Sequence, residues 1–418
     1  MNVELVNTGS ELLLGSVLNT HVRSISEALF PLGLRIARQM TVPDGPLIRE
    51  ALIESFPRAE IVLVTGGLGP TTDDITREVT AELLGLELVH DEAIMAAIAE
   101  RFAKYCLAVG DRVGRQAMRP REATVLPNPF GTAPGLYFPP LAIPASAGAS
   151  GVTRSPHLFL LPGPPRELIP MLESSVVPLL RGIAPPDPAF VMRTWRIAGM
   201  GESKVEETVG EALLATGVEL GYCAKPGEVD VRTIGTPAQV AAAEAIVEEK
   251  LAGYVVSRGG ESLEAAVVEL LISGKKTLAT AESCTGGLLA HRVTNVPGAS
   301  AVFMEGFVTY ANEAKTRALG VDPVLLRDHG AVSSQVAAAM AAGALEKAGT
   351  DYALATTGIA GPGGGTPEKP VGTVYIALAG RDGTSDVQLH RFPTDRATFK
   401  DLVTQTALDL LRRALVGS

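Results

Sequence analysis

Three short polar segments in the last third of the sequence contain residues that suit acyl-transfer chemistry. They cover residues 280–287 (TAESCTGG), 310–315 (YANEAK) and 356–365 (TTGIAGPGGG). Amide hydrolysis needs a nucleophile, a base and a group that stabilises the oxyanion. The first segment supplies the hydroxyl of Ser283, and the second supplies the amine of Lys315. A hydroxyl and an amine that the fold can bring together favour an acyl-transfer site.

The elements around Ser283 would place it on a turn from a strand to a helix. Residues 276–281 have the pattern of a buried strand, and residues 286–293 have the pattern of the helix after it. The first backbone N–H groups of a helix have no partner within it, so they can face an anion or an oxyanion. Ser283 could instead be only an N-cap, which stabilises a helix by about 1 kcal/mol and does no chemistry. Gly286 and Gly287 could serve only close packing of strand and helix.

Together with GAVS at 330–333 and KPVG at 369–372, these segments resemble the C-terminal domain of the CinA family (competence/damage-inducible protein A). The resemblance covers about residues 258–415. The family pattern has a Y-S-N-x-x-K segment, and this sequence departs from it at Ala311, where the family usually has serine. That domain is a nicotinamide-nucleotide amidase, also called NMN deamidase. The resemblance therefore implies hydrolysis of NMN to nicotinate mononucleotide and ammonia.

The resemblance implies a Ser/Lys hydrolase in which Ser283 is the nucleophile, Lys315 is the base and Tyr310 positions or relays a proton. A lysine accepts a proton only when it is neutral, so burial or a nearby positive charge must lower its pKa. No cofactor is expected for this reaction. The loop 358–365 would bring backbone N–H groups close to a ligand phosphate. The residues expected to bind the substrate are Thr285, Gly286, Gly287, Asn312, Thr357, Gly358, Gly361 and Arg396.

Each of these residues also has a purely structural interpretation. Lys315 could be a solvated helix charge, Tyr310 a core tyrosine and Arg396 a partner in a surface ion pair. Cys284 is the rival nucleophile, because a helix N-terminus lowers the pKa of a thiol, although free cysteines are most often buried packing residues. The histidines of this region lie outside the motif segments, which argues against a Cys–His pair. We therefore favour Ser283.

The composition indicates large buried cores and no general attraction to polyanions. Of the 418 residues, 46% are hydrophobic and 20% are charged, and the net charge is −10. The length predicts about three domains, and the charge argues against nucleic acid or an anionic membrane as a partner. Three widely spaced cysteines fit neither a zinc site nor a disulfide framework. We expect a cytoplasmic protein, since the start lacks a basic leader and no apolar run reaches about 18 residues.

The first part of the sequence alternates strands and helices, which predicts a mainly parallel α/β sheet. The expected elements are strands at 3–7 and 61–64 and helices at 20–32 and 47–55. After the second strand come the glycine-rich run 65–74 (TGGLGPTTDD) and a helix at 75–84. Open α/β sheets bind ligands at such turns. The run is neither a dinucleotide-binding fingerprint nor a P-loop.

With TGSELLLG at 8–15, NPFGTAPG at 128–135 and LPGPPRE at 161–167, this part resembles the molybdopterin-binding (MoCF, MoaB-like) domain of full-length CinA proteins. There the domain is associated with metal-dependent ADP-ribose pyrophosphatase activity. Pyrophosphate cleavage needs a divalent cation held by carboxylates, for which Asp73 and Asp74 are the candidates. Both could instead only stabilise the dipole of the next helix. The expected nucleotide site comprises Gly9, Glu11, Gly66, Gly67, Gly69, Thr71, Asp73 and Asp74.

The middle of the sequence resembles the small KH-like α+β domain that links the two ends of full-length CinA proteins. A KH domain that binds nucleic acid needs a Gly-x-x-Gly loop with basic flanks. Residues 199–202 read GMGE instead, so we expect a structural module. The sequence thus predicts an α/β protein with an MoCF-like three-layer domain at 1–167, the KH-like domain at 168–256 and an α/β amidase domain at 257–418.

These observations leave three functional hypotheses. The first is an NMN amidase of pyridine-nucleotide salvage, and the second makes ADP-ribose pyrophosphate cleavage the main activity. The third is a non-enzymatic nucleotide-binding sensor or scaffold linked to competence. We expect the small molecules NMN and ADP-ribose as partners, a divalent metal ion at the N-terminal site, and a homodimer. Ammonia release, metal-dependent AMP release, or binding without turnover distinguishes the three.

Overall fold

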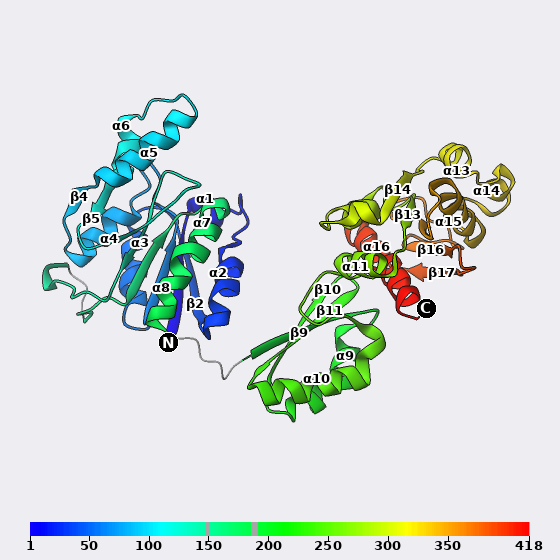
Figure 1. Cartoon of the computed structure of the whole chain (residues 1–418), viewed down its shortest axis with the longest axis horizontal. Coiled ribbons are helices and arrows are strands. Elements are labelled where there is room, and N and C mark those ends of the chain that lie inside the picture. The colour runs from blue at the N-terminus through cyan, green and yellow to red at the C-terminus, as the bar shows by residue number, and fades with distance from the viewer. Residues whose placement is uncertain (148–150, 185–190, 418) are drawn as a thin grey trace. The chain divides into compact units, whose positions relative to one another are not determined.

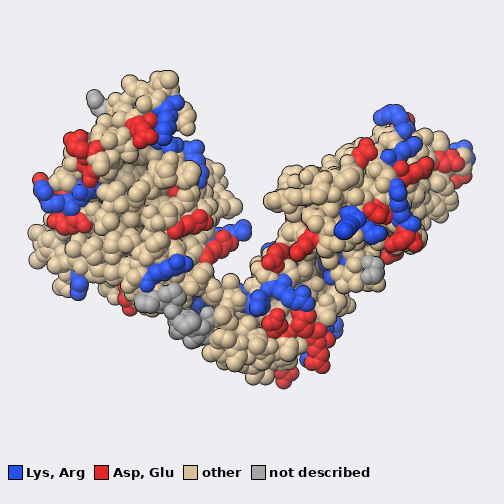
Figure 2. Space-filling view, in the orientation of Figure 1, with Lys and Arg blue, Asp and Glu red and all other residues tan. Residues whose placement is uncertain are grey.

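The computed structural model describes residues 1–147, 151–184 and 191–417, which form two compact units, Met1–Pro188 and Ala189–Ser418 (Figure 1). The mixed α/β architecture expected from the sequence is confirmed in both units. On the face shown in Figure 2, acidic and basic side chains are interspersed. Within the described residues, no helix is both long and apolar enough to cross a membrane.

A six-stranded sheet forms the middle layer of the first unit, with strand order β2-β1-β3-β8-β7-β6. The first four strands in this order pair in parallel, and β7 and β6 join them antiparallel. The strands predicted at 3–7 and 61–64 are β1 and β3. The bounds are β1 Asn2–Thr8, β2 Arg35–Val42, β3 Ile61–Thr65, β6 Thr124–Leu126, β7 Gly135–Phe138 and β8 His157–Leu161.

Helices cover both faces of this sheet, and each face has its own apolar core (Figure 1). α3 (Leu47–Ser55) and α4 (Thr76–Leu84) pack on one face; α2 (His21–Leu29), α7 (Pro165–Met171) and α8 (Val177–Ile183) pack on the other. The helix predicted at 47–55 is confirmed as α3. The remaining elements of the unit are α1 Ser10–Leu13, β4 Leu88–His90, α5 Glu92–Lys104, α6 Asp111–Gly114 and β5 Met118–Pro120.

The helical segment after β8 belongs to the first unit. A π-helical turn, Leu172–Val176, joins α7 to α8. The boundary predicted after residue 167 would have assigned this segment to the middle domain. Its residues Leu168 and Leu180 are instead buried in one core with Leu5 and Leu63 of the sheet. The first unit therefore continues to residue 188.

The second unit begins with a four-stranded antiparallel sheet of order β10-β11-β9-β12. The fully buried Trp195 lies in the core that this sheet forms with α9 and α10. This core contains side chains from alternate positions of β9 and β11, as expected for a sheet that is covered on one face. The bounds are β9 Val191–Ala198, α9 Glu202–Leu214, β10 Glu219–Lys225, β11 Glu228–Gly235, α10 Pro237–Leu251 and β12 Val255–Ser257.

A five-stranded sheet of order β14-β13-β15-β16-β17 follows in the same unit. β14, β13 and β15 are parallel, and β16 and β17 are antiparallel. The core on one face includes side chains of α11, α12 and α16, and the core on the other includes α13 and α15. The strand bounds are β13 Leu278–Glu282, β14 Phe303–Val308, β15 Tyr352–Gly358, β16 Thr373–Gly380 and β17 Ser385–Arg391. The helix bounds are α11 Leu263–Gly274, α12 Leu288–Thr294, α13 Asn312–Leu319, α14 Pro323–His329, α15 Ser334–Ala348 and α16 Arg396–Val416.

The order of this sheet creates a crevice at the carboxyl ends of β13 and β15. The chain leaves β13 toward β14 on one side and leaves β15 toward β16 on the other. Connections that diverge in this way open a crevice in which α/β sheets bind ligands. Ser283 follows β13 directly, and Thr357 lies at the end of β15. The topology therefore brings two of the predicted motifs together.

Candidate functional site

Ser283 and Lys315 form a direct contact in the C-terminal part of the chain. Lys315 Nζ lies 3.0 Å from Ser283 Oγ, 2.8 Å from the Thr309 carbonyl oxygen and 3.3 Å from the Tyr310 carbonyl oxygen. The Lys315 side chain extends from α13, and the residue is only 1% exposed. The interpretation of Lys315 as a solvated helix charge is therefore wrong.

The surroundings of Lys315 favour the neutral amine. Burial lowers the pKa of Lys315. Among the described residues, no carboxylate pairs with its amino group. A neutral amine has two N–H donors and one lone pair, which matches three contacts if the N–H groups serve the Thr309 and Tyr310 carbonyls and the lone pair accepts from the Ser283 hydroxyl. The geometry thus suits a lysine that removes the proton of Ser283.

The turn after Ser283 differs from the predicted one in where the helix begins and in the partners of its N–H groups. The helix begins at Leu288, because Gly286 and Gly287 have φ angles of 63° and 97°, a left-handed region that glycine adopts without strain. The buried Glu282 carboxylate accepts the backbone N–H groups of Gly287, Leu289 and Ala290 at 2.8 to 3.0 Å. The sequence had led us to expect N–H groups at the start of this helix that face an oxyanion. Those of Gly287, Leu289 and Ala290 are instead occupied by Glu282.

Cys284 is a poor nucleophile in this structure. Its side chain is packed in the apolar core, and burial raises the pKa of its thiol to about 12. A thiol with such a pKa carries almost no thiolate at neutral pH, and the thiolate is the reactive form. The neighbouring Thr285 hydroxyl pairs with that of Thr356 at 2.8 Å, so it also serves the interior of the turn.

A cavity of about 230 Å³ opens over the Ser283–Lys315 pair. Arg396, the first residue of α16, donates to the Gly361 carbonyl at 2.9 Å and to the Tyr310 hydroxyl at 3.0 Å. The Tyr310 side chain is not a core residue, since it is 62% exposed. Thr357 is buried and donates its hydroxyl to the Ala331 carbonyl at 2.7 Å. The guanidinium and the tyrosine therefore form one rim of the cavity.

The structure brings together some of the predicted site residues and leaves others outside the cavity. Those that line it are Ser283, Tyr310, Lys315, Thr357, Gly358 and Arg396. Those that do not line it are Thr285, Gly286, Gly287, Asn312 and Gly361. Asn312 is exposed at the start of α13. Glu282 was not predicted, although an acidic residue at the end of a buried strand could have indicated it.

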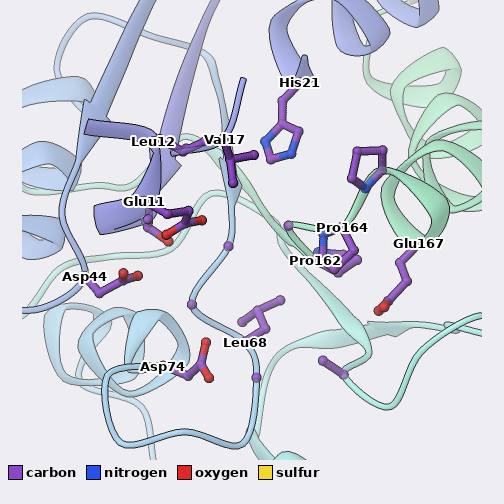
Figure 3. A pocket seen from close by; sticks show the side chains of 18 of the residues that line it. Glu11, Leu12, Val17, His21, Asp44, Leu68, Asp74, Pro162, Pro164 and Glu167 are labelled. Atoms are coloured by element: carbon purple, nitrogen blue, oxygen red, sulfur yellow. The ribbon is translucent and has the colours of Figure 1, made fainter. Parts of the chain in front are cut away.

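The N-terminal unit contains a larger cavity of about 510 Å³ at the carboxyl ends of β1 and β3. Of the predicted residues, it is lined by Gly9, Glu11, Gly66, Gly67, Gly69, Asp73 and Asp74, but not by Thr71. Figure 3 shows the carboxylates of Glu11, Asp44, Asp74 and Glu167 around the opening. The predicted turn thus contributes to a cavity with an acidic lining, and Asp44 and Glu167 add acids that sequence reasoning missed.

Asp73 and Asp74 precede α4 rather than occupying its first turn, which begins at Thr76. Asp74 accepts the backbone N–H of Thr71 at 2.9 Å and also the Thr71 hydroxyl. A Cβ at Gly69 would lie 2.4 Å from Asp74 Oδ2, so only glycine allows this approach. The loop therefore holds Asp74 at the cavity, and neither acid lies in the first turn of α4.

His21 also lines this cavity and was not predicted (Figure 3). Its Nδ1 lies 2.9 Å from Thr65 Oγ1, and the Thr65 hydroxyl donates to Asn7 Oδ1 at 3.0 Å. Burial lowers the pKa of His21, although the Gly163 carbonyl opposes this effect. The chain from Asn7 through Thr65 fixes the imidazole ring in a cavity whose other ionisable groups are acids.

The acidic cavity can contribute only part of a metal coordination shell. Within the described residues, no group of three or more His, Cys, Asp and Glu side chains is arranged to hold a metal ion. Mg²⁺ is commonly bound by one or two carboxylates together with substrate phosphates, rather than by a cage of protein ligands. Asp73 and Asp74 fit that mode of binding.

Three protein-family comparisons match successive parts of the chain. The probable molybdopterin binding domain matches residues 4–182, the damage-inducible protein CinA KH domain matches 192–256 and the CinA C-terminal domain matches 260–415.

Two curated relatives are similar over nearly their whole lengths. A CinA-like protein of Akkermansia muciniphila is 47% identical and covers 98% of this chain and 96% of its own. A CinA-like protein of Dictyoglomus thermophilum is 41% identical with 100% of both chains covered. Among solved structures, the competence/damage inducible protein CihA of Agrobacterium tumefaciens is 41% identical over 37% of this chain and 97% of its own, with a TM-score of 0.35.

Proposed function

The chain belongs to the CinA family, and on this premise we propose that it is a nicotinamide-nucleotide amidase. Its substrate would be NMN, and its products nicotinate mononucleotide and ammonia. The observation that carries the proposal is the buried contact of 3.0 Å between Lys315 Nζ and Ser283 Oγ. A hydrolase of this type has both nucleophile and base within the protein and needs no metal ion.

In the first half of the proposed reaction, Ser283 Oγ attacks the carboxamide carbon while its proton moves to Lys315 Nζ. Lys315 then donates this proton to the amide nitrogen, the C–N bond breaks and ammonia leaves. Among the described residues, the backbone N–H groups of Cys284 and Thr285 have no hydrogen-bond partner in the protein. They are our candidates for oxyanion stabilisation, since the N–H groups at the helix start are occupied by Glu282.

In the second half, water attacks the acyl-enzyme ester and gives a proton to Lys315. Lys315 returns it to Ser283 Oγ as nicotinate mononucleotide leaves. Tyr310 contributes its backbone carbonyl to the Lys315 contacts, while its hydroxyl accepts from Arg396. We therefore assign Tyr310 a positioning role at the rim of the cavity and leave proton transfer to Lys315.

The test is ammonia release from NMN by the purified full chain, with and without a chelator. The expected result is stoichiometric ammonia and nicotinate mononucleotide, unchanged by the chelator. A protein that binds NMN without producing ammonia would contradict the amidase and favour the nucleotide-binding sensor or scaffold. Ammonia production that stops with the chelator would contradict the metal-independent Ser/Lys mechanism.

A second candidate activity, ADP-ribose pyrophosphate cleavage, is favoured by the acidic cavity of the N-terminal unit. The glycine-rich turn and Asp74 lie at the carboxyl ends of parallel strands, where phosphates are commonly bound. Asp73 and Asp74 would hold a divalent cation, which would offset the negative charge of the pyrophosphate. His21 would face the ligand from the opposite wall of the cavity (Figure 3). The test is AMP release from ADP-ribose with Mg²⁺ and with a chelator, and absence of AMP in both would contradict this activity.

A further inference from the structure

The cavity over Ser283 is too small to enclose a whole mononucleotide. Its volume is about 230 Å³, whereas pockets that enclose drug-sized ligands have about 300–1,000 Å³. When the carboxamide carbon is at Ser283, the ribose and the phosphate point away from the Ser283–Lys315 pair. The phosphate must therefore lie at or beyond the rim of the cavity.

Two cations on α16 follow one another along this rim. Arg396 lines the cavity, and Lys400 lies four residues later, a spacing that places both side chains on the same face of a helix. A Cβ at Gly286 would lie 3.8 Å from Lys400 Nζ, so the ammonium group is beside the turn that carries Ser283. The two cations of α16 therefore lie between the cavity, which Arg396 lines, and the turn that carries Ser283, which Lys400 approaches.

Lys400 has no structural partner that would account for its position. Among the described residues, its side chain makes no hydrogen bond or ion pair, and the residue is half-buried. Two acids of the Ser283 turn and of the start of α16 are engaged elsewhere: Glu282 accepts three backbone N–H groups, and Asp395 caps the N-terminus of α16. The other lysine near the site, Lys369, donates to the His329 carbonyl at 2.8 Å beside Gly330.

We infer that Lys400 and Arg396 form the subsite for the phosphate monoester of the substrate. This inference rests on the proposed amidase function and adds a residue to it. A phosphate monoester carries a charge of about −1.5 to −2 at neutral pH, so two cations match it. Arg396 uses two contacts for Gly361 and Tyr310, and a guanidinium has five N–H donors. Gly286 then lies beside the phosphate, outside the cavity.

The experiment compares Lys400→Met with Lys347→Met, an exposed lysine on α15, and with Lys369→Met, a lysine that contacts His329 beside Gly330. The KM and kcat for NMN are measured, together with the Ki of nicotinamide riboside, which lacks the phosphate, as a competitor. We expect Lys400→Met to raise KM for NMN about tenfold or more with kcat nearly unchanged, as for the loss of a charge-assisted hydrogen bond to a substrate. The Ki of the riboside should change less than about twofold.

The possible results separate this inference from the amidase proposal. Ammonia release by the wild type with equal KM in Lys400→Met and Lys347→Met would overturn the phosphate subsite alone. A rise in KM with Lys369→Met but not with Lys400→Met would place the phosphate at the glycine-rich loop and also overturn it. Equal losses for NMN and the riboside in Lys400→Met would indicate a structural role and contradict recognition of phosphate. No ammonia release by the wild type would overturn the amidase and, with it, the subsite.

Discussion

The C-terminal and N-terminal sites differ in what the protein itself brings to a reaction. The C-terminal site has a hydroxyl and an amine 3.0 Å apart, both nearly closed off from water. The N-terminal cavity is about twice as large, 510 against 230 Å³, and its lining includes the acids Glu11, Asp44, Asp74 and Glu167. Carboxylates repel a pyrophosphate unless a cation lies between them. Under the proposed functions, the C-terminal site would depend on the lowered pKa of a buried lysine, and the N-terminal site would depend on a metal ion from solution.

Removing the nucleophile should have the largest effect on the activity of the C-terminal site. Ser283→Ala should lower the kcat of ammonia release by at least about 10³-fold, because the covalent step is lost. Cys284→Ala should keep a substantial fraction of activity, since burial raises the pKa of that thiol to about 12. Both variants should leave any ADP-ribose cleavage unchanged. Full activity in Ser283→Ala with loss in Cys284→Ala would reverse the assignment of the nucleophile.

Changing the base should have the next largest effect. Lys315→Arg should lower kcat by about 10²- to 10⁴-fold, the usual contribution of general base catalysis, because a guanidinium stays protonated. In the wild type, activity should fall as the pH drops through the lowered pKa of Lys315 and rise above it. The unfolded lysine titrates near 10.4, so between these two values the unfolded state binds more protons and the free energy of unfolding rises with pH. Near-normal kcat in Lys315→Arg would remove the lysine from the proton transfer.

The nucleophile and the base could be predicted from the sequence because each lies on a local pattern. A strand, a polar turn and a glycine pair identify the carboxyl end of a parallel strand, where α/β sheets bind ligands. The contact between Ser283 and Lys315 spans 32 residues, and only the family motif linked them in advance. The lowered pKa of Lys315 follows from the burial of its side chain, which depends on tertiary packing that no pattern in the sequence could place.

Three other features could not be predicted from the sequence, each for a different physical reason. Glu282 caps N–H groups five to eight residues later, whereas N-cap patterns involve a residue only two or three positions away. His21 is held by Thr65, which is 44 residues away, so no local signal marks it. The helix after β8 was assigned to the wrong domain because its apolar spacing shows that it packs on a sheet but not on which one.

The N-terminal site should show the complementary dependence. Asp73→Asn together with Asp74→Asn should lower ADP-ribose cleavage by at least about 100-fold, because a metal ion contributes several kcal/mol to stabilising charge on phosphoryl oxygens. A chelator should reproduce this loss in the wild type. Ammonia release from NMN by the double variant is the internal control and should not change. Unaltered AMP release in the double variant would show that the two aspartates are not the metal ligands.

Glu282 tests whether the C-terminal turn must be held rigidly for the amidase to work. In Glu282→Gln one carboxylate oxygen becomes an NH₂ group that faces backbone N–H donors, so we expect kcat to fall about tenfold with little change in KM. The melting temperature should also fall. Glu313→Gln, an exposed acid in the first turn of α13, is the matched control and should behave as the wild type. Equal kcat in the two variants would show that the cap does not position Ser283.

The smallest effect should come from a substitution of Tyr310. The size of this effect decides whether Ser283 and Lys315 carry out the proton transfer without a third side chain. The Tyr310 hydroxyl accepts from Arg396, and the side chain is 62% exposed, so it lies at the rim while Lys315 takes only the backbone carbonyl of this residue. Tyr310→Phe keeps that carbonyl and removes one partly exposed hydrogen bond, which should cost roughly two- to fivefold, mainly in KM. The activity of this variant should rise with pH over the same range as that of the wild type. A loss in kcat as large as that of Lys315→Arg, or a shift of this pH range, would put the phenol in the proton path and make the reaction depend on three protein groups.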